Sequence, residues 1–254
     1  MSILNSAASV LRCFGADCTE LTVTDTVEKL GIPKSNASRL LRAMREAGLL
    51  ETIGDTKRHR PGVLVLDAAI SYRRSSGLVQ RAADVVARIS ADTGHTGYVS
   101  KLIGTEVAAV TDHPGTHALR VVSNIGRRLE AHSSGTGRAL LALMSDAQIR
   151  ALYPEGLVPA SDLSPQSIEE LLTRVAEVRR LGVSYSRQES TRGVDAQSVA
   201  ASDPETGEAV ALCIVYPAAL VADDERLTIE RMLLNGAADV AAALGHTTPT
   251  KRRV

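Results

Sequence analysis

The sequence predicts an α+β protein with two domains, an N-terminal winged helix-turn-helix and a C-terminal domain that mixes helices and strands. Its 254 residues, 44% of them hydrophobic, are enough for packed cores in two modest domains. Near the N-terminus, two short helical patterns joined by a glycine-containing turn precede two short strand patterns. In the rest of the chain, strand patterns around turns alternate with longer helical patterns.

The first two helices are marked by apolar spacing and by their ends. We expect one helix around residues 6–14 and a second in "TVTDTVEKLG", for which Thr24 or Asp25 can provide the N-cap. Gly31 and Pro33 end the second helix, because glycine takes the left-handed C-cap conformation and proline cannot continue a helix.

A third helix begins at about Ser35 in "PKSNASRLLRAMREAG". Its apolar residues recur at helical spacing and form one face: Ala37, Leu40, Leu41 and Met44. Its polar and basic residues point elsewhere: Ser35, Asn36, Ser38, Arg39, Arg42 and Arg45. The plainest interpretation is a solvated outer face. A short preceding helix and a glycine turn favour a helix-turn-helix, in which this helix would enter the major groove of DNA.

The segment after this helix predicts a wing. "LLETI" and "KRHRPGVLV" are typical of two short strands around the turn "GDT". Lys57, Arg58 and Arg60 would then reach phosphates beside the groove. A plain surface hairpin is the alternative.

Charge is unevenly distributed along the chain. With 29 basic and 29 acidic residues the formal net charge is zero, so total charge favours no class of partner. Residues 29–74 nevertheless hold ten basic and four acidic residues, a net charge of +6. Such asymmetry indicates a part that touches a polyanion, although chance clustering is the alternative.

Cysteine usage and hydropathy predict a soluble cytoplasmic protein. Cys13, Cys18 and Cys213 form no CxxC pair and are odd in number, which indicates neither a disulfide framework nor a thiolate metal site. No stretch reaches the ~18 apolar residues of a membrane span, so we expect no contact with a membrane.

A connecting helix should start at Val63 and break at the small residues 75–77. We therefore expect a DNA-binding domain at 1–66, a linker helix at 67–77, a second domain at 78–246 and a basic tail at 247–254. In the second domain, helices are expected at 78–94, 135–144, 165–181 and 223–244, with a hairpin around Gly104 and strands at "LRVVS" and "TGEAVALCIVYP".

Several of these segments resemble the isocitrate-lyase-regulator (IclR) family of bacterial transcription factors. "IPKSNASRLLRAMREAGLLE" resembles the family's recognition helix and the entry to its wing, and residues 58–66 resemble the second wing strand. "NIGRRLEAHSSGTGRALLALMS" is similar to the segment that opens the main helix of the effector domain, and "LGVSYSRQESTRG" to the stretch before its central strand. The resemblance implies a GAF-like second domain, with helices on an antiparallel sheet. Pro61 departs from the usual apolar residue, which predicts a short or edge strand there.

The motif "SSGTG" (residues 133–137) opens a predicted helix, where exposed N–H groups attract carboxylate or phosphate oxygens. A plain N-cap by Ser133 or Ser134 is an equal alternative on the sequence alone. The family resemblance favours a ligand, since this motif borders the effector pocket in IclR-type regulators. It implies an effector carboxylate at Gly135 and Thr136, in a cavity completed by Ser186, Val194, Ala196, Cys213 and Val215. These side chains make a less polar pocket than in members that bind small oxo-acids, which favours a larger or more apolar acid.

Metal binding and catalysis have weaker support. Asp112, His113, His117 and His132 could be assembled into a metal site, but Pro114 and Gly115 prevent the helix that would align two histidines, so we expect no metal and no cofactor. Cys213 lies in an apolar strand and no GxSxG or HExxH is present, so we expect no enzymatic activity.

These features predict a ligand-responsive transcriptional regulator that binds double-stranded operator DNA as a homodimer or homotetramer and senses a small organic acid. Lys34 and Arg42, with the wing, would contact phosphates, while Ser35, Asn36, Ser38 and Arg39 would read base edges. Two alternatives are a metabolite-binding or hydrolytic protein with a vestigial helix-turn-helix, and an architectural DNA binder without sequence preference.

Overall fold

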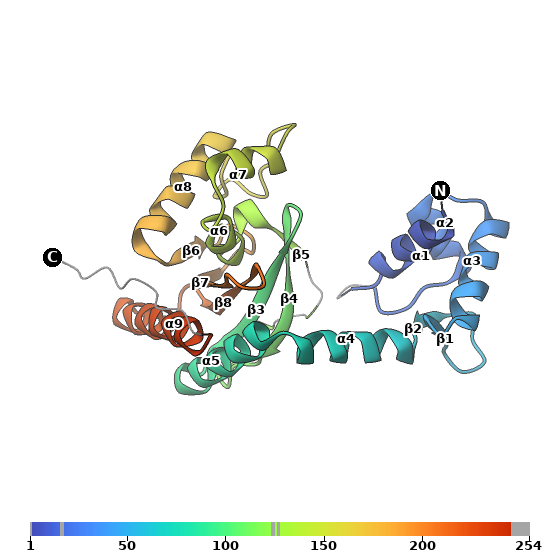
Figure 1. Ribbon diagram of the computed structural model, residues 1–254, viewed down its shortest axis with the longest axis horizontal. Helices are drawn as coiled ribbons and strands as arrows, with labels where there is room; N and C mark the ends of the chain where they lie inside the picture. Colours follow the sequence, from blue (N-terminus) through green and yellow to red (C-terminus); the bar gives the residue numbers. More distant parts are fainter. Residues whose placement is uncertain (1, 16–17, 123–124, 126–127, 245–254) are drawn as a thin grey trace. The chain divides into compact units, whose positions relative to one another are not determined.

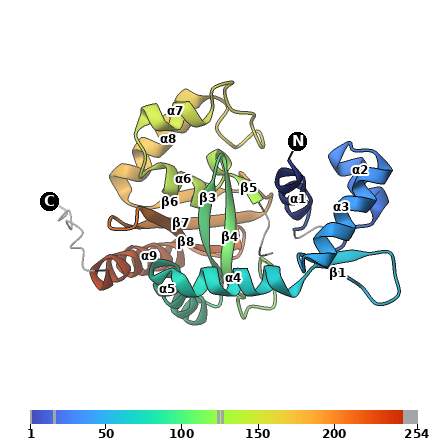
Figure 2. The same ribbon diagram turned by 45° about the vertical axis from the view of Figure 1, so that its right-hand side comes forward.

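The computed structural model describes residues 2–15, 18–122, 125 and 128–244. The chain divides into two compact units, Met1–Ser76 and Gly77–Val254 (Figures 1 and 2). The basic tail expected at 247–254 lies outside the described residues. Within the described part of the chain, no helix has the length and hydropathy that a membrane crossing requires.

The N-terminal unit is a three-helix group with a small hairpin and a following helix. Its elements in order are α1 (Ile3–Arg12), α2 (Val23–Leu30), α3 (Lys34–Glu46), β1 (Leu50–Thr52), β2 (His59–Pro61) and α4 (Val63–Ser75).

The ends of α2 follow from local chemistry. The N-cap is Thr22, two residues before the position we expected, and Asp25 completes a capping box by accepting from the Thr22 backbone N–H at 2.8 Å. The expectation of Thr24 or Asp25 as N-cap was therefore wrong, because a side chain at the third helical position pairs back to the cap. Gly31 ends the helix with φ of 64°, which confirms it as a left-handed C-cap.

The predicted apolar face of α3 is confirmed. Ala37, Leu40, Leu41 and Met44 are its buried residues, and the last three pack in one core with Val10 of α1 and with Leu50 of β1. The remaining positions of α3 are therefore free to face outward.

The wing is shorter than its sequence pattern predicts. β1 and β2 pair antiparallel over three residues each, with Leu50 opposite Pro61. The family resemblance implied a second strand that continues to Leu66, whereas the short strand expected at Pro61 and the connecting helix expected from Val63 are both confirmed. Pro61 has no N–H for a ladder bond, and Gly62 passes so close to Gly48 that a Cβ atom there would lie 2.3 Å from the Gly48 carbonyl oxygen. The chain turns at this contact and enters a helix.

The C-terminal unit is built on a six-stranded antiparallel sheet in the order β5-β4-β3-β8-β7-β6. Its strands are β3 (Thr96–Ile103), β4 (Glu106–His113), β5 (Arg128–Glu130), β6 (Ser184–Arg187), β7 (Val194–Asp203) and β8 (Glu208–Pro217). Its helices are α5 (Gly77–Thr93), the 3-10 turn η1 (Ala131–Ser133), α6 (Gly135–Leu141), α7 (Asp146–Leu152), α8 (Ile168–Leu181) and α9 (Asp223–Ala243).

Helices cover both faces of this sheet (Figures 1 and 2). The alternation of β8 shows why: Leu212 and Ile214 pack in the core beneath α5 and α9, whereas Ala211 packs in the core beneath α6, α7 and α8. Because successive side chains of a strand point to opposite faces, β8 contributes to both cores. This arrangement confirms the predicted α+β class with helices on an antiparallel sheet.

One sequence-based expectation in this unit was wrong, and one helix was missed. "LRVVS" forms no strand over residues 119–122, whose Leu119 and Val122 side chains are exposed, and Ser123 lies outside the described residues. An apolar run does not become a strand when neither face of it is buried. Helix α7 was not predicted, although Ser145 and Gln148 form the capping box that marks its start.

Candidate functional site

The first turns of α3 present a polar and basic surface. Its N-cap, Pro33, makes no side-chain cap hydrogen bond. The side chains of Lys34, Ser35, Asn36, Arg39 and Arg42 are exposed, and Ser38 is half-buried. Uncapped N–H groups and the helix dipole favour an anion at such a helix start.

The cations of α3 are unpaired within the part of the chain that the structure describes. Among the described residues, none forms an ion pair with Lys34, Arg39, Arg42 or Arg45. A guanidinium without a carboxylate partner can pair with phosphate or with a guanine edge at no cost of breaking an existing bond.

The wing cations are held differently, which the sequence did not indicate. Arg58 is ion-paired to Glu20, which precedes α2, and the Nε atom of Arg60 lies 2.6 Å from Oε1 of Glu51 in β1. Lys57 has no ion pair with any described residue. Two of the three side chains predicted to contact phosphate, Arg58 and Arg60, therefore already pair with carboxylates in the free protein.

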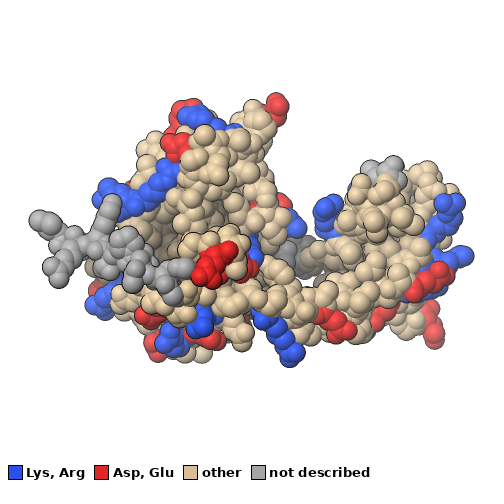
Figure 3. Space-filling model, in the orientation of Figure 1, with Lys and Arg blue, Asp and Glu red and all other residues tan. Residues whose placement is uncertain are grey.

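The whole N-terminal unit carries less charge than the segment 29–74. Residues 1–76 contain eleven basic and eight acidic residues, a net charge of +3. On the face shown in Figure 3, this unit presents both Lys and Arg side chains and Asp and Glu side chains. The local arrangement at α3 therefore matters more than the total charge.

In the C-terminal unit, a small pocket opens between α6 and the sheet, and we call it the hydroxyl-lined pocket. Its free volume is about 70 Å³. It is lined by Tyr98, Ser100, Val107, Ala109, Val121, Val122, Leu129, Thr136, Ser186, Ser190, Thr191, Val194, Ala196 and Val215. Five of the seven residues that the family resemblance implied are thus brought together: Thr136, Ser186, Val194, Ala196 and Val215.

Gly135 and Cys213 do not line the pocket. Gly135 faces the sheet, where a Cβ atom would lie 3.0 Å from Oγ of Ser198. Cys213 is fully buried in β8, opposite Tyr98 on one side and Ser198 on the other. Burial raises the pKa of the Cys213 thiol to about 11, so it remains neutral and behaves as a small apolar side chain.

The pocket is more polar than the sequence predicted. Six of its lining side chains carry hydroxyl groups: Tyr98, Ser100, Thr136, Ser186, Ser190 and Thr191. Four of these residues lie outside the positions that the resemblance implied, so the lining of the pocket includes more hydroxyl groups than those positions alone supply. Tyr98 and Ser100 alternate along β3 and could have been found from that spacing. No charged side chain is among the described lining residues.

The start of α6 is capped by its own sequence. Oγ of Ser134 accepts a hydrogen bond from the Gly137 N–H at 3.0 Å, as the plain N-cap interpretation predicts. The Oγ1 atom of Thr136 donates to Oγ of Ser134 at 3.5 Å, and Oγ of Ser186 donates to the Ser133 carbonyl at 3.3 Å. These bonds fix α6 against β6 and place the Thr136 side chain at the pocket.

A buried ion pair attaches the connection between β6 and β7 to α6. Arg138 is 2% exposed, and its Nη1 and Nη2 atoms lie 2.6 and 2.9 Å from the two carboxylate oxygens of Glu189. Arg138 also donates to the carbonyl oxygens of His132 and Tyr185. Arg174 of α8 binds the same carboxylate at 2.8 Å. Glu189 directly precedes Ser190 and Thr191, so this network positions one wall of the pocket.

The candidate metal ligands are dispersed. Asp112 and His113 lie at the end of β4, the ring of His117 lies tilted by 45° against that of His95 with centroids 4.8 Å apart, and His132 is buried against Tyr153. Within the described ranges, no three His, Cys, Asp or Glu residues gather in a way that could hold a metal ion.

Comparison with known protein families gives two matches. The family described as "Bacterial transcriptional regulator IclR C-terminal" matches residues 70–242, and "IclR helix-turn-helix domain" matches residues 5–54. The transcriptional regulator XynR of Escherichia coli is 26% identical over 243 residues, which cover 94% of this chain and 96% of that protein. The transcriptional repressor IclR of Escherichia coli is 25% identical, covering 89% and 83% of the two chains.

Solved structures share the fold. A putative IclR transcriptional regulator from Silicibacter has a TM-score of 0.85 at 23% identity, and each chain covers 100% of the other. An IclR homolog from Microbacterium hydrocarbonoxydans, complexed with 4-hydroxybenzoate, has a TM-score of 0.81 at 22% identity, covering 96% of this chain and 99% of that one.

Proposed function

Because this chain belongs to the IclR family of bacterial transcriptional regulators, we propose that it reads an operator with α3 and responds to a small organic acid in the hydroxyl-lined pocket. Like the characterised repressors of the family, it is a DNA-binding regulator and not an enzyme. The exposed, uncapped and unpaired start of α3 carries the first half of this proposal.

In this proposal α3 lies in the major groove. Ser35, Asn36, Ser38 and Arg39 read base edges, since they lie in the first two turns and away from the buried face. Lys34 and Arg42 contact phosphates on either side of the groove. Neither role needs a change of fold, because all six side chains except Ser38 are exposed.

The wing adds contacts that depend on charge alone. Lys57 binds phosphate directly, whereas Arg58 and Arg60 exchange a carboxylate partner for a phosphate. Both arginines are more than half exposed, so their ion pairs are screened by solvent and contribute little to stability. The exchange therefore costs little, and the wing holds the register of α3.

Helix α4 supports a symmetric oligomer. None of its residues is buried, although Val63, Leu64, Leu66 and Tyr72 are large apolar side chains. A helix with an uncovered apolar surface is typical of an association site. We propose a homodimer through α4, or a homotetramer of two such dimers, with two copies of α3 on two half-sites.

The effector part of the proposal depends on the hydroxyl-lined pocket. The hydroxyl groups of Ser190 and Thr191 donate to no described residue, and that of Thr136 makes only a 3.5 Å bond to Ser134, which a ligand in the space of about 70 Å³ can replace. A carboxylate accepts hydrogen bonds from several hydroxyl groups at once. The volume is well below the ~300–1,000 Å³ of typical ligand pockets, which favours an acid of few atoms over the larger one that the sequence suggested. One solved relative is complexed with 4-hydroxybenzoate, which is also a carboxylate, and this supports an organic acid as the class of effector.

A mobility-shift titration tests the DNA half of the proposal. The purified protein should retard the DNA upstream of its own gene more strongly than a scrambled duplex of equal length. No retardation would favour a vestigial helix-turn-helix, and equal retardation of both duplexes would favour an architectural binder.

A thermal-shift screen of carboxylates, from acetate and pyruvate to 4-hydroxybenzoate, tests the effector half. A ligand at ~100 times its dissociation constant stabilises a protein by ~2.7 kcal/mol, which is easily measured as a rise in Tm. The acid found in this way should then change the midpoint of the DNA titration. A screen in which no acid raises the Tm contradicts the acid-sensing proposal.

A further inference from the structure

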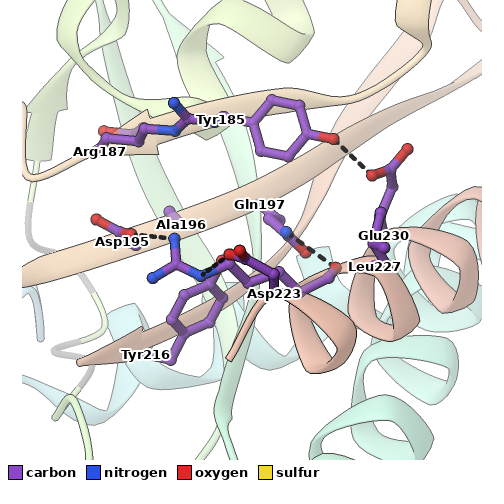
Figure 4. A pocket seen from close by; sticks show the side chains of 11 residues that line it. Tyr185, Arg187, Asp195, Ala196, Gln197, Tyr216, Asp223, Leu227 and Glu230 are labelled. Atoms are coloured by element: carbon purple, nitrogen blue, oxygen red, sulfur yellow. Dashed lines mark hydrogen bonds and ion pairs between the residues drawn. The ribbon is translucent and has the colours of Figure 1, made fainter. Parts of the chain in front are cut away.

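A second pocket lies on the opposite face of the sheet from the hydroxyl-lined pocket, between the β6–β7 edge and α9 (Figure 4). We call it the α9 pocket. Its free volume is about 230 Å³. It is lined by Tyr185, Ser186, Arg187, Asp195, Ala196, Gln197, Tyr216, Asp223, Arg226, Leu227 and Glu230. Ser186 and Ala196, which are opposite each other in the strand register, border both pockets.

Two buried acceptors in the wall of the α9 pocket have no partner. Oδ1 of Asp195 and Oε1 of Gln197 make no hydrogen bond with any described residue, and the two residues are only 4% and 1% exposed. Buried polar atoms in proteins are nearly always hydrogen-bonded, so two orphaned acceptors in one pocket wall need an explanation. A ligand that donates hydrogen bonds would supply it.

The guanidinium of Arg226, next to these acceptors, already has hydrogen-bond partners. Arg226 donates to Oδ2 of Asp195 at 2.8 Å and to the backbone carbonyls of Ala218 and Val221, and none of its N–H groups makes a hydrogen bond with the orphaned oxygens. Glu230 accepts from the Tyr185 hydroxyl at 2.6 Å through one carboxylate oxygen. Its other oxygen makes no hydrogen bond with a described residue and adds a third free acceptor.

Arg187 is the complementary free group. Its guanidinium lies 5.9 Å from the ring centroid of Tyr185 and forms no ion pair with a described residue. The strand register places Arg187 opposite Asp195, and Tyr185 opposite Gln197. The pocket thus combines unpaired acceptors and one unpaired cation on adjacent positions of two strands, as Figure 4 shows.

Two aromatic rings complete the pocket. The chain contains only five tyrosines, one phenylalanine and no tryptophan, yet Tyr185 and Tyr216 both line this space. Ring faces attract ammonium groups and also pack against a short hydrocarbon chain. Leu227 adds a further apolar wall.

We propose that the α9 pocket is a second ligand site, for a small zwitterionic amino acid. Its ammonium group lies toward Asp195, Gln197 and Glu230, its carboxylate pairs with Arg187, and its side chain rests against Tyr185, Tyr216 and Leu227. The site is separate from the hydroxyl-lined pocket and needs no assumption about the effector or about DNA.

Calorimetry with three ligands of similar length tests the proposal on the full chain. Norvaline carries both charges, n-butylamine carries only the ammonium group, and pentanoate carries only the carboxylate. Norvaline should bind once per chain and at least about tenfold more tightly than either of the others, because each lacks one of the two ionic contacts. Absence of heat with norvaline at millimolar concentration, or equal binding of pentanoate or butylamine, would overturn the proposal.

Two variants locate the site. Glu230→Gln keeps an acceptor for Tyr185 and removes the charge, and Arg187→Gln removes the cation at an exposed position. Each should weaken norvaline binding about tenfold, whereas Glu155→Gln, an exposed carboxylate that does not line the pocket, should leave it unchanged. Circular dichroism and the Tm establish that the variants remain folded. Norvaline affinity that is unchanged in both pocket variants would contradict the assignment.

Discussion

Arg138 of α6 and Glu189 of the β6–β7 connection form a two-bond ion pair inside the C-terminal unit, with N–O distances of 2.6 and 2.9 Å. Desolvation lowers the pKa of the Arg138 guanidinium, and the Glu189 carboxylate opposes that shift. The charge of Arg138 therefore depends on Glu189 for compensation, and so does the placement of the pocket wall that follows Glu189.

Glu189→Ala should destabilise the protein by about 3–5 kcal/mol, because it leaves the Arg138 charge buried without a partner. Urea unfolding followed by circular dichroism measures this change. The matched control is Glu169→Ala, which removes the partner of Arg150 from an ion pair whose side chains are 51% and 68% exposed. We expect almost no shift of the unfolding midpoint for the Glu169→Ala variant. Similar midpoints for the two variants would mean that Glu189 has no special role.

Arg39→Ala should abolish operator preference and leave the fold intact. Arg39 is exposed on α3, off its buried face, and a bidentate contact to guanine contributes about 1–3 kcal/mol of discrimination. Parallel titrations of operator and scrambled DNA measure the ratio of affinities. Arg45→Ala, which removes the same charge from the last turn of α3, should weaken both duplexes alike. An unchanged ratio for Arg39→Ala would exclude Arg39 from base reading.

The wing ion pair predicts opposite effects for its two partners. Arg58→Gln should weaken all DNA binding equally and reduce the slope of log affinity against log salt by ~1, as expected for one lost phosphate contact. Glu20→Gln should strengthen binding to both duplexes, because it frees Arg58 and removes a negative charge near the phosphates. A salt slope that does not change in Arg58→Gln indicates that this side chain makes no phosphate contact.

Thr136→Val should weaken binding of the effector acid without altering DNA binding in its absence. The substitution keeps the shape of the side chain and removes a hydroxyl group that borders the pocket, at a cost of about 1–3 kcal/mol for the acceptor left unpaired. Calorimetry with the acid and with its amide separates the charge requirement from shape. If the amide binds as tightly as the acid, a carboxylate is not what the pocket recognises.

Stability should fall as the pH drops from about 7 toward 5. Burial lowers the pKa of His59, His95 and His132 below their unfolded value of ~6.5. In the window between the two pKa values the unfolded chain binds protons that the folded chain does not, so stability is lost as pH decreases. Urea titrations between pH 5 and 8 measure this slope. His132→Phe, which removes one of these groups, should flatten it, and a steeper slope would contradict the assignment.

The sequence by itself determined the elements whose signals are local. The buried face of α3 follows from the 3.6-residue spacing of Leu40, Leu41 and Met44, and the end of α2 follows from Gly31. The hairpin around Gly104, strand β8 and helix α9 were equally predictable from the local sequence. Each of these features depends on residues a few positions apart, so one window of sequence contains the physical cause.

Only the tertiary structure decided which distant side chains meet. Arg58 pairs with Glu20, 38 residues away in the chain, and Arg138 pairs with Glu189, 51 residues away, because these distant segments pack together. The hydroxyl-lined pocket draws residues from α6 and from six strands, β3 to β8, and only the pairing of these strands brings Tyr98 and Ser100 of β3 to the same space as Thr136. The alternation of side chains along a strand is local, but the neighbours that each side chain meets are set by pairing and packing across the fold, so no single window of sequence contains them.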